Sequence, residues 1–200
     1  MRAAAAALTA MLALPGCSAT GELVAPSGEH RMTARDDDSG VTIVLTTGVW
    51  SGEPADLERS TTVIHALVAN LGAAPVLLAP GDLDLRDARR FRYALLDPGA
   101  SFERVDGEDA PAASAGYDRE LQRSYDPGRT LEFQPLLADG DVPRLALPWG
   151  VLEPGTQMRG FLYFEPFVRS AYGGELRWHV GTPDHQPLFD ARFELAVATR

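Results

Sequence analysis

The clearest pattern along the 200-residue chain is a short-range alternation of apolar and polar side chains, interrupted by Gly, Pro and Asn. A period of two is typical of strands with one buried face. The last such stretch is the most regular, because Phe189, Phe193 and Leu195 fall on one side and charged residues on the other. Strands are predicted on these grounds at residues 41–49, 157–165, 176–180 and 188–198.

Residues 61–85 are the segment around which the predicted fold is organised. Residues 61–71 are apolar on both faces, which predicts a central strand that is covered on both sides. Asn70 and Gly72 then supply the geometry of a tight turn, and two short strands are expected at 75–79 and 82–85. This paired unit would nucleate a sheet that later segments complete.

The remaining segments fit the same all-β class. Further strands are predicted at residues 91–96, 130–137 and 142–147. Between them, residues 99–129 are rich in Ala, Gly, Asp and Glu and predict a long loop. It bears one short helix, on which Tyr117, Leu121 and Tyr125 share a face. About eight or nine short strands with turn residues between them favour an antiparallel β-sandwich.

The amino terminus has the composition of a secretory signal peptide. After Arg2, about a dozen apolar residues precede a Leu-Pro-Gly-Cys ending at Cys17. That ending resembles a bacterial lipobox, which implies cleavage after residue 16 and lipidation of Cys17. The alternative is an ordinary signal peptide with a coincidental cysteine.

Residues 17–40 are predicted to be a flexible tether, because they hold few apolar side chains and no sustained period. Within them, Asp36, Asp37 and Asp38 are interpreted as a solvated spacer rather than as a cation site. The predicted organisation is therefore a signal peptide at 1–16, a tether at 17–40 and a sandwich domain at 41–200.

The predicted anchor places the protein at a membrane without a spanning helix. Two or more fatty-acyl chains such as palmitate give stable anchoring, whereas one chain gives marginal binding. Ser18 follows the cysteine, and the resemblance to lipoproteins with serine there implies the outer membrane, facing the periplasm or the cell surface. The expected location is the cell envelope.

The charge of the chain restricts its partners. All 18 basic residues are arginines, and 28 acidic residues bring the net charge to −10. Nucleic acid is therefore not an expected partner, and an anionic lipid surface would repel the chain as a whole. The lone cysteine is assigned to the anchor, so no intramolecular disulfide is expected.

Candidate chemistry is sparse. His179, Asp184 and His185 form the one His/Asp cluster, but their spacing matches no standard metal motif and residues 183–187 are interpreted first as a hairpin turn. Asp82, Asp84 and Asp87 resemble a calcium loop only faintly. Because leucines alternate with the first two, these acids are expected to line the wet face of a strand.

Catalysis is not expected either. Ser114 and Ser170 lie near glycines, yet neither stands in the Gly-x-Ser-x-Gly context of a strained nucleophile turn. We therefore expect no enzyme activity, no catalytic residue, no metal and no cofactor.

An interaction surface is the preferred alternative. A local basic patch on this acidic chain lies next to the tyrosines of the long loop, and Arg and Tyr are favoured at binding hot spots. The competing interpretation is that these arginines only neutralise nearby aspartates. The predicted interaction residues are Arg86, Arg89, Arg90, Arg92, Tyr117 and Tyr125.

Two segments carry a family resemblance. Residues 68–85 contain Asn70, Gly72 and Pro80 followed by Asp-Leu-Asp-Leu, and residues 152–166 contain Pro154-Gly155 and end in Phe164-Glu165-Pro166. They resemble immunoglobulin-like domains of bacterial secreted proteins and lipoproteins, including the family of the secreted mycobacterial immunoprotective antigen. The resemblance implies an immunoglobulin-like β-sandwich and a non-catalytic binding role, with an envelope protein as one partner class. A small-ligand or metal-binding lipoprotein is the alternative.

Overall fold

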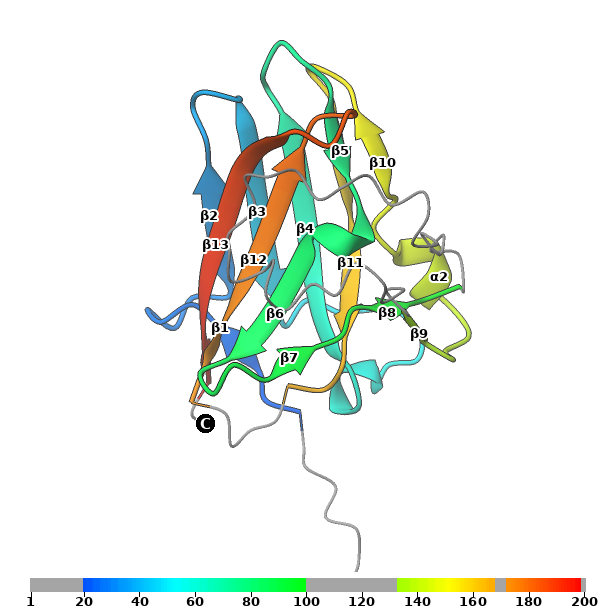
Figure 1. Cartoon of the computed structure of the whole chain (residues 1–200). Coiled ribbons are helices and arrows are strands. Elements are labelled where there is room, and N and C mark those ends of the chain that lie inside the picture. The colour runs from blue at the N-terminus through cyan, green and yellow to red at the C-terminus, as the bar shows by residue number, and fades with distance from the viewer. Residues whose placement is uncertain (1–19, 100–132, 168–171, 199–200) are drawn as a thin grey trace, which may run out of the picture.

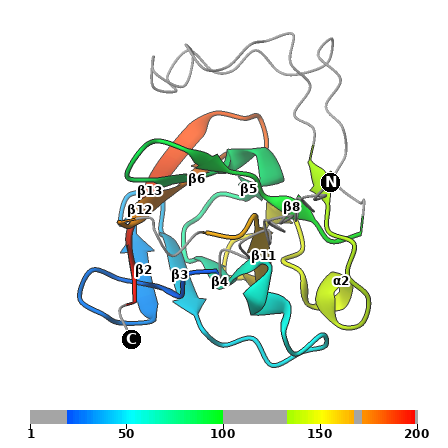
Figure 2. The same ribbon diagram turned by 90° about the horizontal axis from the view of Figure 1, so that it is seen from below.

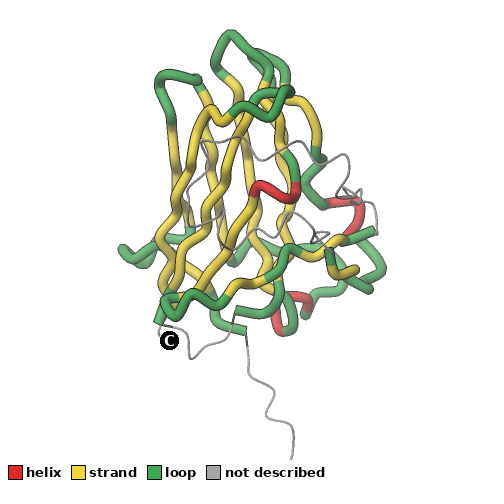
Figure 3. The backbone as a smooth tube through the Cα atoms, viewed as in Figure 1, coloured by secondary structure: helices red, strands yellow, loops and turns green. Residues whose placement is uncertain are grey.

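Two packed β-sheets make up the protein in a computed structural model that describes residues 20–99, 133–167 and 172–198 (Figures 1 and 2). The all-β prediction is confirmed, because helices in the described part of the chain are confined to three short turns (Figure 3). The predicted long loop with Tyr117 and Tyr125 lies outside the described residues, as do the signal peptide and Cys17.

The larger sheet follows the order β1-β13-β12-β5-β10, with β6 and β7 added to β12. Its neighbouring strands are antiparallel throughout. The longest strand is β13, which pairs with β12 from Pro187 to Leu195 and with β1 at Ala196 and Val197. Its strands are β1 (Leu23–Val24), β5 (Val76–Leu78), β6 (Leu83–Asp87), β7 (Arg92–Tyr93), β10 (Gly150–Leu152), β12 (Gly174–Gly181) and β13 (Pro187–Val197).

The second sheet has four antiparallel strands in the order β11-β4-β3-β2. Its strands are β2 (Arg31–Arg35), β3 (Val41–Thr47), β4 (Thr62–Asn70) and β11 (Gln157–Phe164). A short parallel pair, β8 (Leu96–Asp97) and β9 (Gln134–Pro135), lies apart from both sheets. The helical turns are η1 (Leu57–Arg59), η2 (Pro80–Asp82) and α2 (Val142–Leu145).

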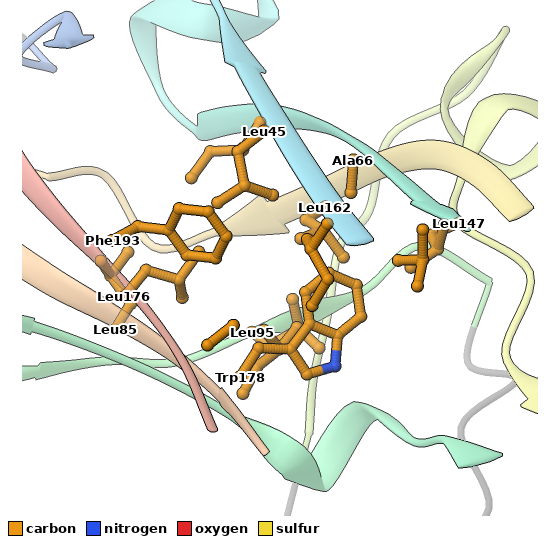
Figure 4. Close-up of a cluster of buried hydrophobic side chains, with 14 of the residues drawn as sticks. Leu45, Ala66, Leu85, Leu95, Leu147, Leu162, Leu176, Trp178 and Phe193 are labelled. Atoms are coloured by element: carbon orange, nitrogen blue, oxygen red, sulfur yellow. The ribbon is translucent and has the colours of Figure 1, made fainter. Parts of the chain in front are cut away.

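The core fills the space between the two sheets. Leu85, Leu176 and Phe193 stand opposite one another on β6, β12 and β13, and Trp178 lies one step along the same inner face. These side chains meet Leu45 and others from the four-stranded sheet (Figure 4). Trp178 is fully buried, and burying an aromatic side chain of this size contributes about 2–3 kcal/mol.

A second, smaller core covers the outer face of β4 and β11. Val63 and Tyr163 point away from the main core and pack with Leu57 of η1 and Val142 of α2. The Tyr163 hydroxyl donates to the Val142 carbonyl at 3.0 Å. The outer face of β4 is thus buried at Val63, whereas His65, Leu67 and Ala69 further along this face are partly exposed, so the predicted two-sided cover holds only for the start of the strand.

Two segment predictions are wrong. Residues 20–40 are not a tether, because β1 pairs with β13 and β2 pairs with β3 along its whole length. An edge strand needs few inward side chains, and in β2 these are Met32 and Ala34. Residues 142–147 were expected to be a strand, but they begin with α2, whose Val142 is buried in the second core.

Candidate interaction groove

Charged side chains from three neighbouring strands share the outer face of the larger sheet, the face turned toward the viewer in Figure 1. The register sets them in two rows across the sheet. In one row Arg86, Glu175 and Glu194 stand side by side, and in the next Asp84, Arg177 and Arg192. Each row thus holds one pair of opposite charges, between β6 and β12, and one pair of like charges, between β12 and β13. Opposite charges directly across a strand pair stabilise by about 0.2–1 kcal/mol, and like charges destabilise.

Asp84 is the centre of this charged network. Oδ2 accepts a hydrogen bond from Arg86 Nε at 2.7 Å, whereas Oδ1 forms an ion pair with Arg92, whose Nε lies 3.2 Å away without hydrogen-bond geometry. The residue is only 7% exposed, so the expectation that it lines a wet strand face is wrong. Its position does face outward, but the long arginine side chains cover it.

The same contacts divide the predicted basic patch in two. Arg86 and Arg92 neutralise Asp84, as the competing interpretation of the patch proposed for them. Arg89 and Arg90 instead stand exposed at the turn between β6 and β7, and within the described residues neither forms an ion pair. Tyr117 and Tyr125 lie outside the described residues, so their part in the patch stays a prediction.

The turn that presents Arg89 and Arg90 is held by Asp87. Asp87 Oδ1 accepts from the backbone N–H groups of Arg89 and Phe91, both at 2.9 Å. Arg90 takes a left-handed conformation with φ of 69°. Asp87 therefore shapes the turn.

A depression of about 420 Å³ opens between this turn and the charged rows. The partly buried side chains Asp84, Arg86, Glu175 and Arg177 form its floor, and the exposed Arg90 and Tyr172 form its rim. Tyr172 is 88% exposed, and its neighbour Gly173 accepts a backbone hydrogen bond from Ala88. We call this depression the β6–β12 groove.

Among the polar side chains that line the groove, those that the sequence had not singled out are Tyr172, Glu175, Arg177 and Glu194. The pattern that could have found Glu175, Arg177 and Glu194 is the alternation of charged with apolar residues on β12 and β13, whereas Tyr172 lies before β12 and has no such signal. That pattern puts every charge of both strands on one face. The pairing of β12 with β6 brings Arg177 opposite Asp84, and only the three-dimensional structure shows it.

The predicted His/Asp cluster does not assemble. His179 Nδ1 lies 2.7 Å from Asp190 Oδ1 on the neighbouring strand, not beside Asp184. His185 sits in the turn after β12, with φ of 57°, as the hairpin interpretation predicted. No group of three or more His, Cys, Asp or Glu side chains suited to a metal is found among the residues that the structure describes.

Asp82 is the most strongly perturbed acid near this face. Burial raises its pKa to about 6, while the backbone hydrogen bond to Ala79 and the charge of His179 act in the opposite direction. Desolvation disfavours the ionised carboxylate and so outweighs both. Ser114 and Ser170, weighed above as nucleophiles, lie outside the described residues.

Within residues 20–99, 133–167 and 172–198, no helix combines the length and the hydrophobicity needed to cross a bilayer.

Comparisons with known proteins give two similar solved structures. One is a putative lipoprotein (ycdA) from Bacillus subtilis, with a TM-score of 0.41, 10% sequence identity, and 84% of this chain covered. The chain spans 39% of that protein's length. The other is MPT63, a secreted protein from Mycobacterium tuberculosis, with a TM-score of 0.34, 11% identity, and 80% of this chain and 89% of that chain covered. No protein-family model matches the sequence, and neither does any curated protein.

Proposed function

We propose that the protein is a lipid-anchored, non-catalytic interaction module of the bacterial cell envelope, and that it binds a partner protein through the β6–β12 groove. The observation that carries the proposal is the groove itself. It combines a fixed floor of paired charges with an exposed rim of Arg90 and Tyr172. Arginine and tyrosine are the residue types that dominate protein-binding hot spots.

The floor of the groove is organised before any partner arrives. Arg86 is held on the buried Asp84, and Arg177 on Glu175 of its own strand. Side chains that are already ordered lose less conformational entropy on binding, which favours affinity. Arg90 of the adjoining turn, which forms no ion pair with any described residue, suits a partner that presents carboxylates.

The proposed anchor is Cys17, at the end of the lipobox-like residues 14–17. Acyl chains on Cys17 would keep the domain at a membrane, and Ser18 favours the outer membrane by resemblance to other lipoproteins. A binding module in that position would recruit a partner protein to the envelope or help assemble a surface complex.

A small-ligand role is the second candidate, and the groove volume favours it. About 420 Å³ lies within the range of roughly 300–1,000 Å³ that is typical of small-molecule sites. Such sites are, however, mostly apolar and enclose their ligand, whereas this groove is lined by charges and opens to solvent. A protein surface therefore fits it better.

Purification of the full-length protein from envelopes tests the groove. Tyr172→Ala and Arg177→Gln each remove a groove side chain. Arg35→Gln is the matched control, because Arg35 is exposed on β2 and pairs there with the exposed Asp37. We expect a co-purifying protein that both groove variants lose and the control retains. Retention of that protein by both groove variants would contradict the proposal, and a small molecule that depends on Tyr172 would establish the second candidate.

A further inference from the structure

The folded domain begins only three residues after Cys17. Thr20 is already fixed to the sandwich, since its hydroxyl donates to the Arg59 carbonyl at 2.8 Å. The next residue, Gly21, donates its backbone N–H to the Phe167 carbonyl at 2.7 Å. Only Ser18 and Ala19 separate Cys17 from Thr20, and a chain of this length reaches at most about 10 Å.

From this we infer that one end of the sandwich docks on the lipid headgroup surface of the anchoring membrane, with Arg59, Arg89 and Phe91 at the contact. The inference rests on the proposed lipidation of Cys17. A spacer of two residues holds the attachment point of the domain within about 10 Å of the lipid, so the end that contains Thr20 must face the membrane. We call this the membrane-facing end.

The β6–β7 turn belongs to the membrane-facing end. Tyr93, at the end of the hairpin, stacks on Phe167 with ring centroids 4.6 Å apart, and Phe167 is the residue that binds Gly21. Figure 1 shows β1, the β6–β7 turn and the end of β13 together at the lower end of the molecule. The turn therefore projects toward the same surface as the chain that leads to Cys17.

The side chains at this end suit a lipid interface. Phe91 packs edge-on against Tyr93 and is 61% exposed, so most of its surface is not covered by the described residues. Arg89 is exposed beside it, and Arg59 is exposed at the entry of the chain. An aromatic ring can enter the headgroup region, and each arginine near an anionic surface contributes about 1 kcal/mol of attraction.

The acids at this end interfere less than their number suggests. Asp87 is engaged with the N–H groups of the turn. Burial, followed by the neighbouring Glu22 charge, raises the pKa of Glu58, so its carboxyl is more easily neutralised near a negative surface. The net charge of −10 opposes recruitment of the domain from solution, and the contact therefore depends on the lipid.

Single-thiol labelling of the lipidated protein tests the docking. Lipidation consumes the one native cysteine, so Phe91→Cys or Arg89→Cys introduces the sole free thiol for a fluorescent label. Leu71→Cys is the matched control, because Leu71 is 66% exposed in the turn after β4, at the other end of a nine-residue strand that starts beside Phe167. Strand rise puts the two ends about 25 Å apart.

The full-length protein is reconstituted into vesicles of phosphatidylethanolamine and phosphatidylglycerol, and aqueous iodide is the quencher. We expect labels at positions 89 and 91 to be quenched several-fold less than the label at 71, and nitroxide-labelled headgroups to quench them selectively. Equal quenching at all three positions in protein whose lipid is confirmed by mass spectrometry would overturn the docking alone. Protein without lipid would overturn the proposed anchor and the docking together.

Discussion

Asn70 donates from its side-chain Nδ2 to the backbone carbonyl of Leu152 at 3.0 Å, and this bond joins the two segments that carry the family resemblance. The same amide nitrogen also donates to the Ala74 carbonyl at 2.8 Å, and Oδ1 accepts from the Gly72 N–H at 3.0 Å. Asn70 is completely buried. One side chain thus closes the turn after β4 and ties it to β10 of the other sheet.

Asn70→Ala should be among the most destabilising single changes in the protein. It leaves the carbonyls of Leu152 and Ala74 and the Gly72 N–H without their bonds, at about 1–3 kcal/mol for each buried group that stays unsatisfied. We expect a loss of about 2–5 kcal/mol in the free energy of unfolding, measured by urea denaturation. Leu71→Ala, in the same turn but exposed, should change it by less than about 0.5 kcal/mol, and equal effects would contradict this role.

Replacement of the buried carboxylate of Asp84 should lower the free energy of unfolding far more than replacement of an exposed carboxylate. Asp84→Asn removes the charge that holds Arg86 and Arg92 together, and breaking a buried ion pair costs up to about 3–5 kcal/mol. Because both arginines are partly exposed, we expect about 2–3 kcal/mol by denaturant unfolding.

Asp37→Asn is the matched control for Asp84, since Asp37 pairs with Arg35 at 2.6 Å and both side chains are mostly exposed. We expect it to cost less than about 1 kcal/mol. A comparable loss in the two variants would mean that Asp84 does not organise the groove floor.

The raised pKa of Asp82 predicts a pH dependence of stability. Since the folded-state pKa is about 6 and the ordinary value 3.8, the folded state favours the protonated carboxyl. This contribution to stability is fully present when the pH is below the ordinary pKa of 3.8, and it is lost as the pH rises through about 6. The difference amounts to about 3 kcal/mol, because one pKa unit corresponds to about 1.4 kcal/mol.

Asp82→Asn removes this dependence. As the pH rises from 4 to 8, the free energy of unfolding of the variant should increase relative to that of the unchanged protein. Thermal or urea unfolding at the two pH values measures this difference. If the difference in unfolding free energy between the two proteins is the same at both pH values, the pKa of Asp82 is not raised in the folded state.

Gly160 permits the close approach of β11 to the segment after α2. A Cβ on Gly160 would lie 2.5 Å from the backbone N and Cα atoms of Leu147. Backbone cannot yield as a flexible side chain does, so Gly160→Ala should lower the free energy of unfolding by about 1–3 kcal/mol or more.

Gly155→Ala separates crowding from conformational strain. Gly155 has a φ of 74° but open space around its Cβ position, so its replacement should cost about 1 kcal/mol through strain alone. Thermal unfolding of the two variants provides the comparison, and a smaller loss for Gly160→Ala would contradict the close contact.

The sequence predicts the strands whose inward positions are almost all apolar. Ile43 and Leu45 in β3, and Ala191 and Phe193 in β13, fall on the buried side that alternation assigns to them. Register across a sheet with one buried face leaves little freedom, so these strands follow from a local pattern.

The two errors have local physical causes. Strand β2 has only Met32 and Ala34 facing inward, and its stability comes from pairing with β3, which a local pattern does not contain. The α2 segment alternates as a strand would, but Pro143 follows Asp141 in the first helical turn, which is typical of a helix start and was the better indicator.

The candidate site was predictable only in part. Asp84 and Arg86 are two residues apart on one strand, so their shared face follows from sequence. Arg92 reaches the same carboxylate only because β7 folds back on β6, and Glu175 and Arg177 arrive from a strand about ninety residues later. Long-range pairing of this kind assembles the groove.

The most direct test of the proposed function is the intact mass of the protein extracted from bacterial membranes. Lipidation predicts a chain that begins at Cys17 and carries an additional mass of fatty-acyl chains, and Cys17→Ala should leave the protein unprocessed or outside the membrane fraction. A membrane-bound chain that begins at another residue without added lipid would contradict the account, as would a processed Cys17→Ala variant that still fractionates with membranes.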